Sequence, residues 1–258
     1  MTIYTYEKSG RGRVLSKMLS ESRTLQRFSS ATVLPIPTTK DGRTLNGTDI
    51  PLSAVLPLVS AQDLIIGYGI PEGLREDLEA KGAIVCDSLF DERFLEDNGY
   101  LTAVATVGII ITSSEKAVCD MSIGIVGYGR IGKSLTRILL SLGARVKVLT
   151  SRRGTCLELG ESGISSAIST SEADIENLDL LINTAPAVIF DTSSEEKFPG
   201  KLRVIDLASG DNFPGLSNVE RYPSVPAKMF PFSSGKIWFE SVERMLPELK
   251  EERKGERR

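Results

Sequence analysis

Six residues between two regular segments have the spacing of a nucleotide-binding turn. Gly127-Tyr128-Gly129-Arg130-Ile131-Gly132 follows the apolar run Ser122 to Val126 and precedes a helical pattern from Lys133 to Leu142. In such a turn the first glycine permits a sharp bend, the second lets the backbone approach a pyrophosphate, and the third allows close helix–strand packing. The N–H groups that open the helix then face the phosphate charge. The motif predicts a dinucleotide site; the alternative is a glycine-rich turn without a ligand.

The residues after the next strand indicate which dinucleotide is bound. The strand Arg145 to Leu149 ends in Thr150-Ser151-Arg152-Arg153. An NAD site usually has Asp or Glu here for the ribose 2′-hydroxyl, and none is present. Two guanidinium groups and two hydroxyls suit a 2′-phosphate, which arginine can bind through two hydrogen bonds. The pattern favours NADP over NAD; the alternative is a solvated basic loop.

Polar residues also follow two later predicted strands. The strand Leu178 to Ile182 leads into Asn183, Thr184 and Pro186, and the strand Leu202 to Leu207 contains Asp206 and leads to Ser209. Ligands of doubly wound sheets lie outside the carboxyl ends of the strands, so we expect these residues to line the nicotinamide end of the site. For Asp206 the alternative is a buried carboxylate that caps neighbouring backbone.

The elements that must position these residues alternate between strands and helices, which predicts parallel sheets. In the N-terminal third a glycine-rich turn, Ser9 to Gly12, follows the first strand. We expect strands at Ile3 to Tyr6, Thr32 to Ile36, Leu64 to Ile66 and Ala83 to Cys86, and helices at Arg13 to Leu25 and Pro71 to Lys81. A buried helix should run from an Asp97-Asn98 cap to about Ser114, and an amphipathic helix from Ile237 to Leu249, which Pro247 should end or kink.

These elements predict an α/β fold with two doubly wound parallel-sheet domains, the second of them Rossmann-like. A linking helix joins the domains, and the C-terminal helix packs back on the first. We expect residues 1–95 to form a flavodoxin-like substrate domain, 96–118 the interdomain helix, 119–225 the dinucleotide-binding domain, 226–249 the returning helix and 250–258 a charged tail.

The composition excludes several classes of function. The chain has 258 residues, with 31 Lys and Arg against 34 Asp and Glu, a formal net charge of −3 and no histidine. Without an imidazole there is no Ser-His-Asp triad, no His-ligated zinc and no His-dependent 2-hydroxy-acid dehydrogenase. The charge balance gives no general attraction for nucleic acid or anionic membranes. We also expect no metal site.

The cysteines and the N-terminus indicate a cytoplasmic protein. Cys86, Cys119 and Cys156 are odd in number and far apart in sequence, which is typical of buried thiols in a reducing compartment. The N-terminal residues show no apolar signal-peptide core, and the apolar run Ala103 to Ile111 is too short to span a bilayer.

Several motifs resemble the A subunit of dipicolinate synthase, along nearly the whole chain. They are Asn183-Thr184-x-Pro186, Asp206-Leu207-Ala208-Ser209, Val225-Pro226-Ala227 with Pro231 and Gly235, Leu34-Pro35-Ile36-Pro37, Gly10-Arg11-Gly12-Arg13 and Asp87 to Phe90. Other positions depart from the family pattern: Gly210-Asp211-Asn212 replaces a Pro-Gly-Gly, Arg11 replaces an aspartate, and polar and acidic residues are missing around Thr102 to Gly108.

The resemblance implies an NADP-linked oxidation of a dihydropyridine dicarboxylate to dipicolinate, in sporulation, with a flavoprotein, the B subunit of that enzyme, as partner. We also expect a homo-oligomer. Two carboxylates on the substrate require cations and hydrogen-bond donors. We choose Arg13, Lys228, Ser209, Ser233 and Ser234 for substrate binding.

In the absence of histidine, Asp206 and Lys236 are the candidate catalytic acid–base groups. Lys228 and Lys236 have an alternative reading as ordinary surface charges. Two other functions remain open: another His-independent NADP oxidoreductase, or a catalytically silent NADP-binding regulatory or scaffold protein, which the altered motifs keep in view.

Overall fold

The structure is a computed structural model in which residues 1–168, 175–187, 202–216 and 218–246 are described. It divides into two compact units. Unit 1 comprises Met1–Asn98 and the chain from Pro226 onward, and unit 2 comprises Gly99–Val225. Each unit has its own parallel sheet and its own core, so each is described by itself.

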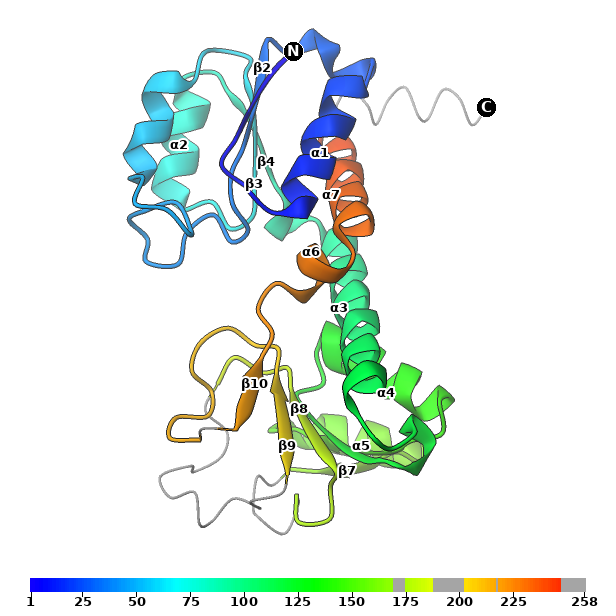
Figure 1. Ribbon diagram of the computed structural model, residues 1–258. Coiled ribbons are helices and arrows are strands. Elements are labelled where there is room, and N and C mark those ends of the chain that lie inside the picture. The colour runs from blue at the N-terminus through cyan, green and yellow to red at the C-terminus, as the bar shows by residue number, and fades with distance from the viewer. Residues whose placement is uncertain (169–174, 188–201, 217, 247–258) are drawn as a thin grey trace. The chain divides into compact units, whose positions relative to one another are not determined.

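The sheet of unit 1 has four parallel strands in sequential order. They are β1 (Thr2–Thr5), β2 (Ser30–Val33), β3 (Leu64–Gly67) and β4 (Ile84–Asp87). Figure 1 shows α2 on one side of this sheet and the pair α1 and α7 on the other. The helices of the unit are α1 (Gly10–Glu21), α2 (Glu72–Ala80), α6 (Val225–Met229, whose first residue belongs to unit 2) and α7 (Pro231–Met245), with 3-10 turns η1 (Thr24–Arg27), η2 (Leu52–Leu58) and η3 (Ser88–Phe90).

Each face of this sheet has a separate hydrophobic core. On one face Leu15 and Leu19 of α1 pack with Trp238 and Val242 of α7. On the other face Leu74 and Leu78 of α2 pack with the residues of η2. Strand residues of alternating orientation contribute to the two clusters, as the period of two in a strand requires. The C-terminal helix α7 is therefore part of the core of unit 1.

The sheet of unit 2 has six parallel strands in the order β10-β9-β8-β5-β6-β7. The strands are β5 (Ser122–Val126), β6 (Arg145–Leu149), β7 (Ser165–Ala167), β8 (Leu180–Asn183), β9 (Arg203–Asp206) and β10 (Val219–Arg221); the unit also contains α4 (Arg130–Ser141), α5 (Arg153–Glu161) and the 3-10 turn η4 (Val118–Asp120). The chain runs from β5 outward to β7 and then returns to the other side of β5. This reversal makes a switch point beside β5, where ligands of such sheets bind.

The helix α3 (Glu92–Ser113) contains the boundary between the units, which falls after Asn98. It is 22 residues long and contains the apolar run Ala103 to Ile111. By length and composition alone α3 could cross a bilayer, but half of its apolar window is buried inside the protein. Core helices of soluble proteins have the same character.

The structure confirms an α/β fold with two parallel sheets, and β5 and β6 have the predicted bounds. Several helix starts were predicted too late. The turn Ser9 to Gly12 is the first turn of α1, because the Ser9 hydroxyl accepts a hydrogen bond from the N–H of Gly12. The helix α3 begins at Glu92, after Asp91 accepts the N–H of Arg93, and not at the Asp97-Asn98 pair.

Other boundaries differ for similar local reasons. The helix α4 begins at Arg130 instead of Lys133, and α7 begins at Pro231 instead of Ile237, since proline fits the first helical position. The helix α1 ends at Glu21 and α7 at Met245, short of the predicted Leu25 and Leu249. Residues 247–249 and the predicted charged tail, 250–258, lie outside the described residues.

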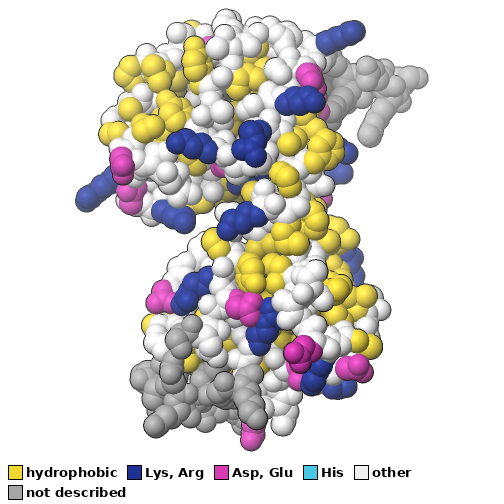
Figure 2. All heavy atoms as spheres, viewed as in Figure 1, with side chains coloured by type: hydrophobic (Ala, Val, Ile, Leu, Met, Phe, Trp, Pro, Cys, Tyr) yellow, Lys and Arg dark blue, Asp and Glu magenta, His cyan; other side chains and the backbone are white. Residues whose placement is uncertain are grey.

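Charged side chains of both signs are dispersed over the face seen in Figure 2. They do not gather there into one basic stripe. This distribution agrees with the small net charge of −3.

Candidate nucleotide-binding site

The turn between β5 and α4 is tightly packed at its first and last glycines. Gly127 has a φ of +89°, a left-handed conformation that favours glycine. A β-carbon built there would lie 2.8 Å from the hydroxyl oxygen of Thr184. A β-carbon on Gly132 would collide with the carbonyl oxygen of Gly127. These two glycines are required by the protein's own packing.

The middle glycine has a different environment. A β-carbon built on Gly129 meets nothing within 4 Å, and its φ of −83° is accessible to any residue. Neither the fold nor the backbone therefore requires glycine at this position. Gly129 is also the N-cap of α4, and no side chain caps the helix. The space and the uncapped N–H groups together fit a phosphate that approaches the backbone closely.

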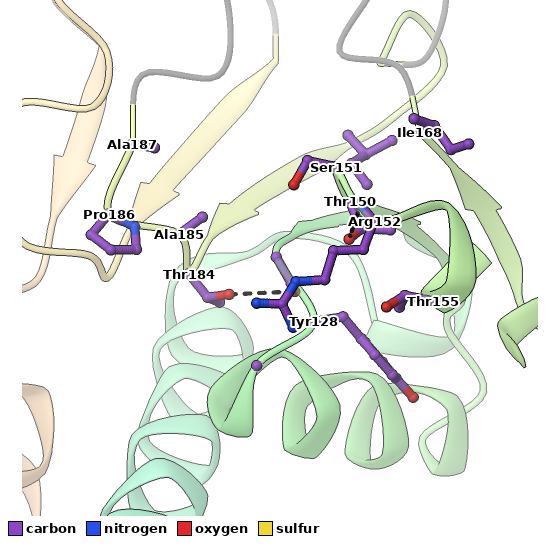
Figure 3. A pocket seen from close by; sticks show the side chains of 13 residues that line it. Tyr128, Thr150, Ser151, Arg152, Thr155, Ile168, Thr184, Ala185, Pro186 and Ala187 are labelled. Atoms are coloured by element: carbon purple, nitrogen blue, oxygen red, sulfur yellow. Dashed lines mark hydrogen bonds between the residues drawn. The ribbon is translucent and has the colours of Figure 1, made fainter.

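A pocket of about 600 Å³ opens beside this turn, at the carboxyl ends of β5, β6 and β8 (Figure 3). Its volume is in the range of small-molecule and cofactor sites. The lining residues are Gly127, Tyr128, Gly129, Leu149, Thr150, Ser151, Arg152, Thr155, Ile168, Thr184, Ala185, Pro186 and Ala187. Eight of the thirteen belong to the predicted cofactor set, counting from Gly127 to Pro186.

Five predicted cofactor residues are absent from this lining: Arg130, Ile131, Gly132, Arg153 and Asn183. The first three lie in the opening turn of α4, whereas Arg153 is the first residue of α5. Five lining residues were not predicted: Leu149, Thr155, Ile168, Ala185 and Ala187. Leu149 and Ala185 could have been found as neighbours of predicted residues in the strand ends. Thr155 carries no signal in the sequence, because only the turn of α5 brings it to the pocket.

The loop after β6 presents one arginine to the pocket. Thr150 is buried, and its hydroxyl oxygen accepts a hydrogen bond from the N–H of Arg152 at 3.2 Å. The Arg152 side chain projects into the pocket in Figure 3, and its neighbours Ser151 and Thr155 supply hydroxyl groups. Among the described residues that line the pocket there is no aspartate or glutamate. The described part of the site therefore has the polarity of an anion site.

The ends of β8 and β9 are joined by a buried polar network centred on Asp206. Its Oδ1 accepts hydrogen bonds from Asn183 Nδ2 at 2.8 Å and from the N–H of Ala208 at 3.1 Å. Asn212 Nδ2 donates to both Asp206 oxygens, at 3.4 and 3.2 Å. Asp206 and Asn183 are each 1% exposed. The network fixes the strand end that leads to Thr184 and Pro186, so Asp206 is a buried carboxylate that holds neighbouring backbone.

The remaining predicted residues fall in both units. Ser209 of unit 2 is exposed. Lys236 of unit 1 is exposed and pairs with Glu240 at 3.8 Å, and Arg13 donates to the carbonyl of Lys8 at 3.3 Å. Lys228 is exposed, Ser233 is half-buried and Ser234 is fully buried, all in unit 1.

Comparisons with known proteins agree with this architecture. No protein-family model matches the chain. In sequence the chain is similar to the A subunit of dipicolinate synthase of Bacillus subtilis (strain 168), with 23% identity over 198 residues, which make up 73% of this chain and 66% of that protein. The matched region thus spans slightly less than two thirds of the relative's length. The resemblance expected from the sequence motifs is confirmed.

Solved structures show the same fold. The A subunit of dipicolinate synthase from Bacillus halodurans has a TM-score of 0.74 at 18% identity, covering 95% of this chain and 97% of that one. The transhydrogenase from Sinorhizobium meliloti has a TM-score of 0.61 at 14% identity, covering 96% and 92%. D-lactate dehydrogenase with NAD⁺ from Lactobacillus jensenii has a TM-score of 0.53 at 11% identity, covering 97% of each chain. The fold is therefore Rossmann-like, as in dehydrogenases.

Proposed function

We propose that this protein is an NADP-dependent oxidoreductase that oxidises a dihydropyridine dicarboxylate to dipicolinate. The observation that supports nucleotide binding best is the open space at Gly129, where the protein itself gives no reason for glycine. The likeness to the A subunit of dipicolinate synthase supports the substrate class. Dehydrogenase structures with the same fold support hydride chemistry.

The residues of the pocket have separate roles in holding the dinucleotide. The backbone from Gly127 to Gly129 and the opening turn of α4 bind the pyrophosphate. Arg152, with Ser151 and Thr155, binds the 2′-phosphate of the adenosine ribose. Thr184 and Pro186 lie along the nicotinamide end, held there by the network of Asp206. Hydrogen bonds from the Thr184 hydroxyl to the carbonyls of Val126 and Gly127, at 2.8 and 3.4 Å, keep the two strand ends together.

A bound NADP⁺, held by the glycine turn, Arg152 and the Thr184–Pro186 strand end, would supply the hydride acceptor that the dihydropyridine ring needs in order to become aromatic, with one proton released to solvent. The protein's part is to position substrate and cofactor and to exclude water. Asp206 acts as a positioning residue, because its oxygens already accept several hydrogen bonds. Lys236, exposed and paired with Glu240, is a weaker candidate for proton transfer than solvent.

The experiment is a calorimetric titration with NADP⁺ and with NAD⁺. We expect NADP⁺ to bind at least about tenfold more tightly, since a charge-assisted phosphate contact contributes roughly 1.5–3 kcal/mol. Arg152→Ala should remove this preference by weakening NADP⁺ alone. Arg153→Ala is the matched control, because the neighbouring arginine does not line the pocket. Equal affinity for the two nucleotides, unchanged by Arg152→Ala, would contradict the assignment.

A second candidate is a catalytically silent NADP-binding protein. It is favoured by the described pocket lining, in which no aspartate, glutamate or lysine is present to transfer a proton. Turnover of a dihydropyridine dicarboxylate separates the two, measured as NADPH absorbance with and without the flavoprotein of dipicolinate synthase, its B subunit. NADP⁺ binding without turnover under both conditions would favour the silent protein.

We also propose that such a flavoprotein is the partner, that the protein forms a homo-oligomer, and that it acts in the cytoplasm during sporulation.

A further inference from the structure

Unit 1 contains a buried arginine without a hydrogen-bond acceptor. Arg11, in the first turn of α1, is 4% exposed, and its Nε is buried with no partner. The nearest carboxylate oxygen, Glu7 Oε2, lies 3.7 Å from its Nη2, beyond hydrogen-bond distance. In the described part of the chain no group lies within hydrogen-bond distance as an acceptor for this guanidinium. Burial lowers the pKa of Arg11, and the charge of Glu7 opposes that shift.

Both carboxylate oxygens of Glu7 accept hydrogen bonds from the backbone. Its Oε1 accepts the N–H of Ser9 at 3.1 Å, and its Oε2 accepts the N–H of Ile36 at 3.0 Å. It therefore balances the charge of Arg11 while it fixes the entry to α1. A buried guanidinium whose Nε has no acceptor is unfavourable unless an acceptor from outside the chain completes it.

Two further buried polar atoms of unit 1 have no hydrogen-bond partner. Ser234 Oγ and Trp238 Nε1 are fully buried and make no hydrogen bond to any described residue. They are four residues apart on α7, so they share one face of that helix. The Arg11 guanidinium lies over the Trp238 ring, 5.4 Å from its centroid. A β-carbon on Gly235 would lie 2.8 Å from the carbonyl oxygen of Arg11, which shows how closely α1 and α7 approach here.

The amino-terminal ends of α1 and α7 also meet at this place. The two helices lie side by side in Figure 1. A β-carbon on Gly10, the first residue of α1, would lie 2.6 Å from Cβ of Pro231, the first residue of α7. Both helix dipoles therefore present their positive ends to the same region, which favours an anion. The region lies at the carboxyl ends of β1 and β2, the usual ligand edge of a parallel sheet.

We propose that Arg11, Ser234 and Trp238 form a binding site for a carboxylate group of a small organic acid. The two carboxylate oxygens match the planar donors of a guanidinium, and the serine hydroxyl supplies a further donor. This assigns Arg11, in place of the exposed Arg13, as the cation that recognises the acid. The inference deepens the proposed function and rests on it, since the acid is the dihydropyridine dicarboxylate substrate.

The test is calorimetric titration of the full-length protein with dipicolinate, the oxidised counterpart of that substrate. We expect binding to weaken at least about tenfold in Arg11→Met and about threefold to tenfold in Ser234→Ala, with Arg11→Lys between wild type and Arg11→Met. Arg23→Met, which removes an exposed arginine of the same unit, should bind like wild type. Because Trp238 is the chain's one tryptophan, its fluorescence should change on binding in wild type and not in Arg11→Met.

Circular dichroism of each variant shows whether it is folded. If Arg11→Met does not fold, the dipicolinate affinity of Ser234→Ala decides the test. NADP⁺ titration of the same variants separates the two proposals. Loss of dipicolinate binding with normal NADP⁺ binding supports the site. No dipicolinate binding to wild type, a loss in Arg13→Met but not in Arg11→Met, or a crystal soaked with dipicolinate that holds only water at Arg11 would overturn it. Dipicolinate binding without NADP⁺ binding would instead leave this site standing and overturn the cofactor assignment.

Discussion

Neighbouring residues of the same type in this protein have different surroundings. Arg152 lines the proposed nucleotide pocket and its neighbour Arg153 does not. Arg11 is buried, while Arg13, two positions on, is exposed. The three glycines of the phosphate turn differ in the same way, because two are enclosed by protein and the third faces open space. Residue type and spacing identify the candidate binding residues. The packing around each candidate shows whether it can contact a ligand or is needed by the fold.

This difference leads to a prediction for Gly129 and Gly132. Gly129→Ala should weaken NADP⁺ binding at least about tenfold, because its methyl group points into the ligand's space. The free energy of unfolding should change by less than about 0.5 kcal/mol, because the lower N-cap preference of alanine is offset by the smaller entropy of its unfolded chain. Gly132→Ala should lower the free energy of unfolding by roughly 1–3 kcal/mol, because its methyl group collides with backbone. Denaturant unfolding and nucleotide titration measure the two effects. If Gly129→Ala destabilised the protein as much as Gly132→Ala, the open space would not be a ligand site.

At the scale of elements, an ion pair joins β9 and β10 at the edge of the unit 2 sheet, in addition to their backbone pairing. Arg203 Nε and Nη2 lie 2.5 and 2.9 Å from the two carboxylate oxygens of Glu220, and the Tyr222 hydroxyl donates to Glu220 at 2.9 Å. The strand β10 has three residues and pairs with β9 alone. The hydrogen bonds from Arg203, more than the opposing effect of partial burial, hold the pKa of Glu220 below its ordinary value of 4.5.

We therefore expect Glu220→Gln to lower the free energy of unfolding by roughly 1 kcal/mol at neutral pH, the upper range for a partly exposed ion pair. Since the folded-state pKa is depressed, the carboxylate stabilises the fold fully above its ordinary, unfolded pKa. That stabilisation is lost as the pH falls through the lower, folded-state pKa. Urea unfolding of wild type and variant at pH values on both sides of 4.5 measures the difference. Glu161→Gln, at an exposed glutamate of α5, is the control, and a pH-independent difference would contradict the argument.

On the scale of the whole molecule, the chain folds into two units with separate cores. The clusters around Trp238 and around Leu74 belong to unit 1, and a cluster around Leu181 and Phe213 belongs to unit 2. The proposed nucleotide pocket is built from residues of unit 2 alone, and the proposed carboxylate site from residues of unit 1 alone. Each ligand should therefore stabilise its own unit first.

The single tryptophan allows this to be measured, because Trp238 is buried in unit 1. NADP⁺ at about a hundred times its Kd should stabilise unit 2 by about 2.7 kcal/mol. We expect the thermal transition measured by circular dichroism to broaden or split, because the unfolding of unit 2 moves to higher temperature. The midpoint of tryptophan fluorescence should move little. Equal shifts of both signals would show that the two units unfold as one.

The sequence by itself determined the strand–turn–helix of the candidate nucleotide site. The bounds of β5 and β6 follow from the residues alone, because each is a short β-rich segment beside a turn glycine, Gly127 after β5 and Gly143 before β6. The phosphate turn is equally local, since its three glycines lie within one bend. Eight lining residues of the pocket were accessible to sequence reasoning for that reason.

Only the tertiary structure decided the rest. The first residues of α1 and α3 could be assigned only from the structure, in which the side chains of Ser9 and Asp91 accept hydrogen bonds from backbone N–H groups. The role of Asp206 depended on Asn183 and Asn212, which reach it from a neighbouring strand and a following loop. Arg11 became a candidate for binding because α7, more than 200 residues away in the chain, covers it and offers no acceptor. The burial of a side chain and its hydrogen-bond partners depend on residues that are distant in the sequence. They are therefore defined only in the folded protein.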